Sequence, residues 1–385
     1  MYKRQQLLGI LAFVVALLFS VMVHEFGHYL TARHYGMKVS EFFLGFGKRL
    51  WSTQRGETEF GIKAIPAGGY CRIEGMAPND QMPAGEEERA FYKASSGKKL
   101  IVLGAGSFLH FVLGYLLLFT LFAGVGTNQV LPVIGEVVAS SAAQEAGIKA
   151  GDEVTSINGV PVKNWYKDVE AIRNSEGKQL TLGIKRDGQE LTISATPRLT
   201  DVEGTKRYVL GIVNTIGMKR SDLLQSTSYA FTATKSFITQ SAQSLVALPS
   251  KIPALWGQTV RGEERDANGL VGVVGVARVS GEAVGNTQLS ISERVATFIL
   301  IVASLNIFVG IFNLLPILPL DGGHMAVAIA DEVRALFARI RRRPRPAAID
   351  VTVLTPVTMV VFVILASLTL LLLVADVINP VTLNL

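Results

Sequence analysis

Four long stretches without a charged side chain dominate this 385-residue sequence. They run from Gln5 to Val23, from Leu100 to Gly135, from Val295 to Leu320 and from Val351 to Ala375. A helix needs about 20 apolar residues to cross the hydrocarbon core of a bilayer, and lipid offers no partner to an unsatisfied backbone group. The sequence therefore predicts an α-helical polytopic membrane protein with four transmembrane helices.

The basic side chains indicate how these helices are oriented. Eleven Lys and Arg residues lie between positions 33 and 99, six Arg lie between 322 and 350, and none follows Ala375. Because cytoplasmic loops of membrane proteins carry an excess of Lys and Arg, we expect both segments in the cytoplasm and both chain termini outside. Lys3 and Arg4 favour the opposite orientation, but the six arginines outweigh them. The net charge of +6 is therefore no sign of nucleic-acid binding.

The first apolar stretch ends in the motif His24-Glu25-Phe26-Gly27-His28. It lacks the small-residue site at which a signal peptide is cut, so we expect it to stay in the protein. Positions i and i+4 share one face of a helix, so both imidazoles can bind one metal ion with Glu25 beside them as a base. Ionisable groups within a membrane segment mark functional sites, and this motif is therefore the predicted active site.

A catalytic zinc ion takes a third protein ligand and leaves its fourth position to water. Asp321 is the candidate, since it follows the apolar segment NLLPILPL at the end of the third stretch. His24 lies about 17 residues into the first stretch, roughly 25 Å at 1.5 Å per residue. In the expected topology both side chains then lie near the cytoplasmic side of the membrane. Pro316 and Pro319 are expected to end the third helix at this depth.

Residues 130 to 200 alternate apolar and polar positions over short runs, and Asp187–Gly188 is typical of a hairpin turn. The segment AAQEAGIKAGDEVTSINGVPV, residues 142–162, resembles the core of a PDZ domain of the bacterial protease type. This resemblance implies an inserted, extracytoplasmic α+β domain that binds peptides at a sheet edge. A domain that only excludes bulky substrates is the alternative. Leu131–Gly135 is the expected carboxylate-binding loop.

Together these features resemble the site-2 protease family of intramembrane zinc metalloproteases, peptidase M50, in a form with one PDZ domain. Members carry HExxH in one span and an Asn-containing segment ending in Leu-Asp-Gly in a later span, here Asn313 to Gly322. The resemblance implies that His24, His28 and Asp321 bind one Zn2+ per chain. It also implies that Glu25 activates the water molecule that attacks the peptide bond.

The resemblance further implies how a substrate is held. A peptide bond must leave its helix before it can be cut, and the freed backbone groups then need partners. Residues 58–73 are expected to form a membrane-associated β-hairpin around Pro66–Gly69, whose edge can pair with an extended substrate. The predicted substrate-binding residues are one amide, two glycines that precede the hairpin and two prolines: Asn313, Gly45, Gly47, Pro316 and Pro319.

One position departs from the family pattern. Relatives often have Gly-Pro and Asn at the start of the second span, where this chain has Gly106–Ser107 and His110. An intramembrane histidine there either hydrogen-bonds to a neighbouring helix or helps to shuttle protons or gate access. Asn306 in the third stretch is expected to join helices by packing.

The chain divides into the following predicted parts. They are a first transmembrane helix with HExxH (1–32), a cytoplasmic loop with the hairpin (33–98), a second transmembrane helix (99–126), the PDZ domain (127–203), extracytoplasmic helices and loop (204–292), a third transmembrane helix with the Leu-Asp-Gly motif (293–321), a basic cytoplasmic loop (322–350), a fourth transmembrane helix (351–376) and a tail (377–385). Pro249 and Pro253 are expected to end an amphipathic helix that begins after residue 221.

The resemblance implies an enzyme of the bacterial cytoplasmic membrane that cuts the transmembrane segments of single-span proteins. Typical substrates of the family are anti-sigma factors and remnant signal peptides, in regulated intramembrane proteolysis, and the PDZ domain would meet a peptide or the outer part of the substrate. A catalytically silent scaffold that recruits partners through the PDZ domain is one rival. A metal transporter is another, but it would need polar residues along several spans, and the second and fourth have few.

Overall fold

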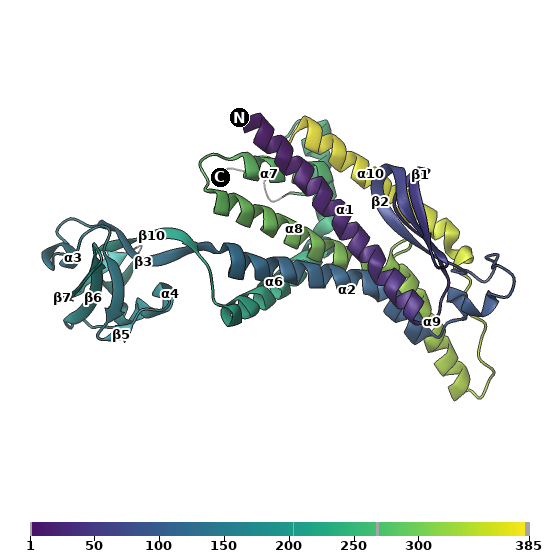
Figure 1. The fold of residues 1–385 in the computed structure, drawn as a ribbon, viewed down its shortest axis with the longest axis horizontal. Coiled ribbons are helices and arrows are strands. Elements are labelled where there is room, and N and C mark those ends of the chain that lie inside the picture. The colour runs from purple at the N-terminus through teal and green to yellow at the C-terminus, as the bar shows by residue number, and fades with distance from the viewer. Residues whose placement is uncertain (1, 203, 267–268, 382–385) are drawn as a thin grey trace. The chain divides into compact units, whose positions relative to one another are not determined.

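The computed structural model describes residues 2–202, 204–266 and 269–381 (Figure 1). The chain forms two compact units, one of residues 1–123 with 222–385 and one of residues 124–221. The first unit holds the long helices, and the second is rich in strands. Residues 382–385 of the expected tail lie outside the described residues.

Four helices of the described chain are long and apolar enough to cross a membrane, which confirms the expected number. They are α1 (Tyr2–His34), α2 (Ser96–Thr120), α8 (Ile291–Asn313) and α10 (Thr355–Ile378). One π-helical turn, Leu121–Val125, extends α2, and a short 3-10 turn, Val351–Leu354, precedes α10. Ser290 and Glu293 form a capping box that satisfies two backbone N–H groups at the start of α8.

Glycines bring the membrane helices of the first unit close together. α1 lies against α7 (Val273–Gly285), and a Cβ at Gly9 would come within 2.9 Å of the Gly281 Cα. α2 lies against α8, where a Cβ at Gly114 would come within 2.7 Å of the Ile307 side chain. Helices in lipid associate through close packing of small residues, so these contacts fix the helices that carry the site.

Helix α6 (Leu223–Val260) continues through Pro249 and Pro253, so the expectation that these prolines end the helix is wrong. Each proline in a helix interior removes one hydrogen bond and costs about 3 kcal/mol. However, α6 packs against α2, α8 and α10. Tertiary packing supplies most of the stability of a protein helix, and here it outweighs the local cost.

The third membrane helix ends earlier than expected, and a further helix follows it. α8 stops at Asn313, before both prolines, and Asp321 begins α9 (Asp321–Ile340) instead of closing the transmembrane helix. Most of the expected basic loop 322–350 is therefore helical. Apolar side chains at helical spacing, including Ile329, Val333 and Leu336, explain why this basic segment folds as an amphipathic helix.

A two-stranded sheet of β1 (Val39–Arg55) and β2 (Thr58–Ile73) packs against α1. Residues 41–44 of β1 pair with residues 69–72 on one side and with residues 59–62 on the other. The expected hairpin within 58–73 is therefore wrong, because β1 lies between the two halves of β2. An alternating pattern specifies strands but leaves their partners open.

The second unit is a six-stranded sheet with short helices. Its main strands run in the order β10-β3-β4-β6-β7, with β5 beside β4, and β8 pairs separately with β9. The strands are β3 (Thr127–Val137), β4 (Glu153–Ile157), β5 (Val160–Pro161), β6 (Leu180–Arg186), β7 (Gln189–Ala195), β8 (Arg198–Val202), β9 (Thr205–Val209) and β10 (Ile212–Lys219), and the helices are α3 (Ala142–Glu145), α4 (Trp165–Asp168) and α5 (Glu170–Arg173). β10 pairs with β3, so this unit extends beyond the expected boundary at residue 203.

The expected turn at Asp187–Gly188 joins β6 to β7, and both residues have positive φ, as a two-residue hairpin turn requires. Near it, the fully buried carboxylate of Asp152 accepts two hydrogen bonds of 2.7 Å from Arg186. A third bond comes from the backbone N–H of Lys149 at 2.8 Å. The Arg186 guanidinium holds the pKa of Asp152 below its usual value.

Acid is expected to loosen the second unit. A lowered pKa contributes stability that is present above the ordinary carboxyl pKa of about 4 and is lost as the pH falls through the lowered value. The protection factors for amide hydrogen exchange of residues 124–221 in the full protein, corrected for the intrinsic exchange rate, should therefore fall below about pH 4. Arg186→Gln should weaken this acid dependence, and an unchanged dependence in that variant would contradict the assignment.

Candidate metal centre

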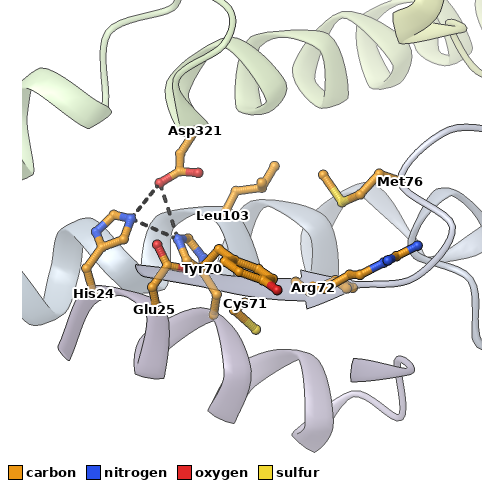
Figure 2. A pocket seen from close by; sticks show the side chains of 10 residues that line it. His24, Glu25, Tyr70, Cys71, Arg72, Met76, Leu103 and Asp321 are labelled. Atoms are coloured by element: carbon orange, nitrogen blue, oxygen red, sulfur yellow. Dashed lines mark hydrogen bonds and ion pairs between the residues drawn. The ribbon is translucent and has the colours of Figure 1, made fainter. Parts of the chain in front are cut away.

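Helix α1 presents two imidazoles and a carboxylate within two turns. His24 and His28 are each 7% exposed, and their ring centroids are 4.7 Å apart. Because α1 continues unbroken to His34, the i,i+4 spacing is kept and the two Nε2 atoms lie 3.0 Å apart. Figure 2 shows the Glu25 carboxylate on the same side of α1 as the His24 ring.

Asp321 reaches the histidines from the first turn of α9 (Figure 2). The chain between α8 and α9 folds back tightly over that turn. A Cβ at Gly322 would collide with the carbonyl oxygens of Leu314 and Leu315, and a Cβ at Gly323 would collide with the backbone of Leu318. The two glycines after Asp321 are therefore required for the close approach that places its carboxylate.

The three potential ligand atoms form a small triangle. Asp321 Oδ2 lies 3.2 Å from His24 Nε2 and 3.3 Å from His28 Nε2, and the two nitrogens are 3.0 Å apart. Two ligands at about 2.0–2.1 Å from a tetrahedral zinc ion are about 3.3 Å from each other. The triangle therefore has nearly the size of one face of a zinc tetrahedron, which leaves a fourth position for water or substrate.

The surroundings of the triangle also suit a cation. His28 Nδ1 lies 2.8 Å from the Val102 carbonyl oxygen, which can only accept, so Nδ1 carries the hydrogen and Nε2 keeps its lone pair. Asp321 Oδ2 is buried and has no hydrogen-bond partner among the described residues. A divalent ion would satisfy both atoms, and one carboxylate with two imidazoles is a ligand set that zinc accepts. The residues present therefore fit zinc.

A cavity of about 380 Å³ opens beside these ligands. It is lined by His24, Glu25, His28, Tyr70, Cys71, Arg72, Ile73, Met76, Leu103 and Asp321. Residues 70–73 belong to the half of β2 that pairs with β1 on one side only among the described strands. The backbone of Cys71 lies within hydrogen-bonding reach of the Glu25 carboxylate. A metal ion, a base and an extended peptide can thus share one space.

Helix α2 passes directly over the two imidazoles. A Cβ at Gly106 would lie 2.5 Å from His24 Cε1 and 2.7 Å from His28 Nε2, closer than atoms can approach without displacement. Gly106 therefore lets α2 press the two rings into place. This role depends on the packing of α2 against α1, which no local sequence pattern reveals.

Gly106→Ala is expected to lower both zinc affinity and proteolysis at least about tenfold, the scale of a disturbed ligand orientation. The matched control is Gly104→Ala on the same helix, where the nearest atom is Met325 Cε at 3.8 Å. That variant should keep zinc and activity, with a helix propensity gain of up to about 1 kcal/mol. Metal analysis of both purified variants, with cleavage assays, makes the comparison. Equal zinc binding in the two variants would contradict the steric role.

His110 joins α2 to α8 behind the metal ligands. Its Nδ1 lies 3.0 Å from Asn306 Oδ1, and Asn306 Nδ2 donates to the Val302 carbonyl at 2.8 Å. The expected hydrogen bond to a neighbouring helix is thus confirmed, as is the role of Asn306 in joining helices. The His110 ring also lies near His24, with centroids 5.0 Å apart.

The five expected substrate-binding residues do not line the cavity. Asn313 is the half-buried last residue of α8, and Pro316 and Pro319 lie in the turn between α8 and α9. Gly45 and Gly47 have positive φ and bend β1, and a Cβ at Gly45 would lie 2.7 Å from the Ile65 carbonyl oxygen. The structure gives these glycines a role in the backbone, and substrate contact by all five stays a prediction.

Several cavity residues had not been singled out from the sequence. Tyr70 and Arg72 line the cavity. The sequence predicts that their segment, residues 58–73, contacts the substrate, but it does not indicate these two side chains in particular. Nothing in the sequence marks Met76 and Leu103 as cavity residues, because apolar side chains are common in loops and in membrane helices. Only the approach of α2 and β2 to α1 brings them to the site.

The sequence model of peptidase family M50 matches residues 12–365 of this chain. The chain belongs to peptidase family M50. Zinc metalloprotease Rip1 of Mycobacterium tuberculosis is 33% identical over 410 residues, which cover 97% of this chain and 98% of Rip1. Rip1 of Mycolicibacterium smegmatis is 32% identical over 407 residues, with the same coverage of both chains.

Membership of family M50 makes this membrane protein an intramembrane zinc metalloprotease. It confirms the family expected from the two motifs and sets aside the silent scaffold and the transporter. His24, His28 and Asp321 are the group of metal-ligand side chains that converges in the described part of the chain. This triangle is therefore the candidate zinc site for the peptide-bond hydrolysis typical of family M50.

Proposed function

We propose that His24, His28 and Asp321 bind one zinc ion per chain and that Glu25 is the catalytic base. The triangle of ligand atoms, with edges of 3.0, 3.2 and 3.3 Å, carries this proposal. When bound, zinc acts as a Lewis acid and lowers the pKa of water toward neutrality. Glu25 would take a proton from the attacking water as its oxygen bonds to the carbonyl carbon, and would pass it to the amide nitrogen as the C–N bond breaks.

We infer that the substrate binds as an extended strand beside residues 70–73 of β2. This edge lines the cavity and pairs with no second described strand, so its backbone can replace helical hydrogen bonds that the substrate gives up. Asn313 can add an amide that both donates and accepts. The side chain of Asn313 is half-buried at the end of α8, the helix that leads to the turn before Asp321.

We propose that residues 124–221 form a PDZ domain that meets the outer part of the substrate. The compact unit and the PDZ-like segment 142–162, which spans α3 to β5, support this assignment. The positive-inside rule favours a location of this unit, and of both chain termini, outside the cytoplasm. The protein would then act in the bacterial cytoplasmic membrane, with its active site near the cytoplasmic side.

We propose single-span proteins with a cytoplasmic N-terminus as substrates, such as anti-sigma factors or remnant signal peptides. The test uses the purified protein in lipid vesicles with a labelled transmembrane stub, built in both orientations. Cleavage within the membrane segment of the N-cytoplasmic stub alone, abolished by a chelator and restored by zinc, is the expected result. Equal cleavage of both orientations would refute the substrate class, and cleavage that survives chelation would refute the metal mechanism.

A further inference from the structure

The two candidate histidine ligands differ in what holds their second ring nitrogen. His28 donates from Nδ1 to the Val102 carbonyl oxygen at 2.8 Å. Nδ1 of His24 is buried and has no hydrogen-bond partner among the described residues. A histidine that binds a metal ion through Nε2 carries its hydrogen on Nδ1, and an acceptor for that hydrogen fixes the orientation of the ring. An acceptor for His24 has therefore to be found.

The Nδ1 edge of His24 faces helix α2. A Cβ at Gly106 would lie 2.5 Å from His24 Cε1 and 2.6 Å from His24 Nδ1. His110 follows Gly106 by one helical turn on the same face of α2. Its ring is 2% exposed, and its centroid lies 5.0 Å from that of His24, with the two planes 40° apart. Two imidazoles at this separation can be joined directly after a small rotation, or by a single water molecule.

Asn306 determines which nitrogen of His110 can accept. Asn306 Nδ2 donates to the Val302 carbonyl oxygen at 2.8 Å, so Asn306 Oδ1 is the atom that lies 3.0 Å from His110 Nδ1. An amide oxygen only accepts, and His110 Nδ1 therefore carries the hydrogen. In a neutral imidazole the other nitrogen, Nε2, then keeps its lone pair. The ring beside His24 is thus left with an acceptor.

We propose that His110 is a positioning residue for the zinc ligand His24. Nε2 of His110 accepts the hydrogen of His24 Nδ1, either directly or through one water molecule. The inference rests on the proposed zinc site and adds a relay of hydrogen bonds to it. The relay begins at the backbone of α8, passes through Asn306 and His110, and ends at the ligand on α1.

Helix α2 would then orient both histidine ligands from one face. Positions 102, 106 and 110 follow one another at a spacing of four residues, so they share a face over three turns. The Val102 carbonyl holds His28, Gly106 leaves room for both rings, and His110 holds His24. Loss of a group that orients a metal ligand typically costs 10–100-fold in metal affinity.

The first test measures zinc affinity of the full-length protein in detergent, by competition with a chelator. His110→Phe keeps a ring of similar size but removes the acceptor, and it should weaken zinc binding about 10–100-fold. His110→Gln offers an amide oxygen near the place of Nε2 and should restore most of the affinity.

Ser107→Ala is the matched control. Ser107 lies on the same helix, is fully buried, and its Oγ has no hydrogen-bond partner among the described residues. Removal of a buried hydroxyl that lacks a partner is nearly neutral, so this variant should bind zinc as the unsubstituted protein does. Equal losses in Ser107→Ala and His110→Phe would show that any polar group of α2 near the site has the same effect, and would overturn the proposal.

The second test observes the hydrogen bond by NMR. The chain has five histidines, so the zinc-loaded protein labelled with 15N in histidine gives few ring signals. We expect the His24 Nδ1–H signal to shift in His110→Phe and to return toward its original position in His110→Gln. Asn306→Leu, which frees the tautomer of His110, should shift the same signal. A role of His110 in packing alone would leave the signal in place, because phenylalanine fills the same space.

The outcomes separate this inference from the proposed function. Normal zinc binding in His110→Phe, with an unshifted His24 signal, would refute the relay and leave the zinc site standing. Absence of zinc from the unsubstituted protein, under conditions in which it is folded, would refute the zinc site and the relay with it.

Discussion

Glu25→Gln is expected to slow intramembrane cleavage by about 10²–10⁴-fold, the usual contribution of a positioned general base. Glutamine has nearly the same shape as glutamate, so α1 and the two imidazoles should keep their places. Its amide cannot take a proton from water or return it to the leaving nitrogen. The variant should therefore bind zinc as tightly as the unsubstituted protein. Single-turnover cleavage of a labelled stub, with metal analysis of the same sample, measures both quantities.

Measuring cleavage and zinc content together distinguishes a role of Glu25 in proton transfer from a role in the structure of the metal site. Loss of cleavage together with loss of zinc would mean that Glu25 supports the site's structure instead of the proton transfer. Near-normal cleavage with full zinc content would assign the base to another group, and the described cavity offers no second carboxylate except Asp321.

Asp321→Ala should weaken zinc binding by more than about 100-fold, since even the loss of a group that only orients a ligand costs 10–100-fold. Two imidazoles from α1 would remain, and two ligands do not complete a catalytic zinc site. Cleavage should fall with the metal. Equilibrium dialysis against a zinc buffer and the same stub assay measure the change. The side chain is 22% exposed, so its loss opens only a small cavity.

His324→Ala is the matched control for this variant. His324 lies in the same first turn of α9 as Asp321 but is not part of the converging group of metal ligands. It should keep its zinc. If His324→Ala lost zinc as Asp321→Ala does, the third ligand would have to be reassigned.

The ligands of the site could be predicted because each depends on a rule that does not require the tertiary packing to be known. The i,i+4 spacing places His24 and His28 on one helix face whatever packs around it. Asp321 could be matched to them because a bilayer fixes the depth of each span. The backbone around Asp321 could not be predicted from the sequence. The beginning of α9 and the close approach at Gly322 depend on how the turn after α8 folds back.

The parts of the fold that the sequence did not reveal are those set by tertiary partners. Alternation identified the strands in residues 58–73, but only the structure shows that β1 lies between their two halves. Pro249 and Pro253 should end a helix by local rules, yet packing carries α6 through them. The second unit extends beyond the expected domain boundary because β9 and β10 follow residue 203 and β10 pairs with β3.

X-ray absorption at the zinc edge of the purified, catalytically active protein tests the central claim most directly. The account predicts one zinc ion per chain with two imidazole nitrogens and a carboxylate oxygen at about 2.0–2.2 Å. It also predicts that the carboxylate contribution disappears in Asp321→Ala. A first shell without imidazole, or one that Asp321→Ala leaves unchanged, would contradict it.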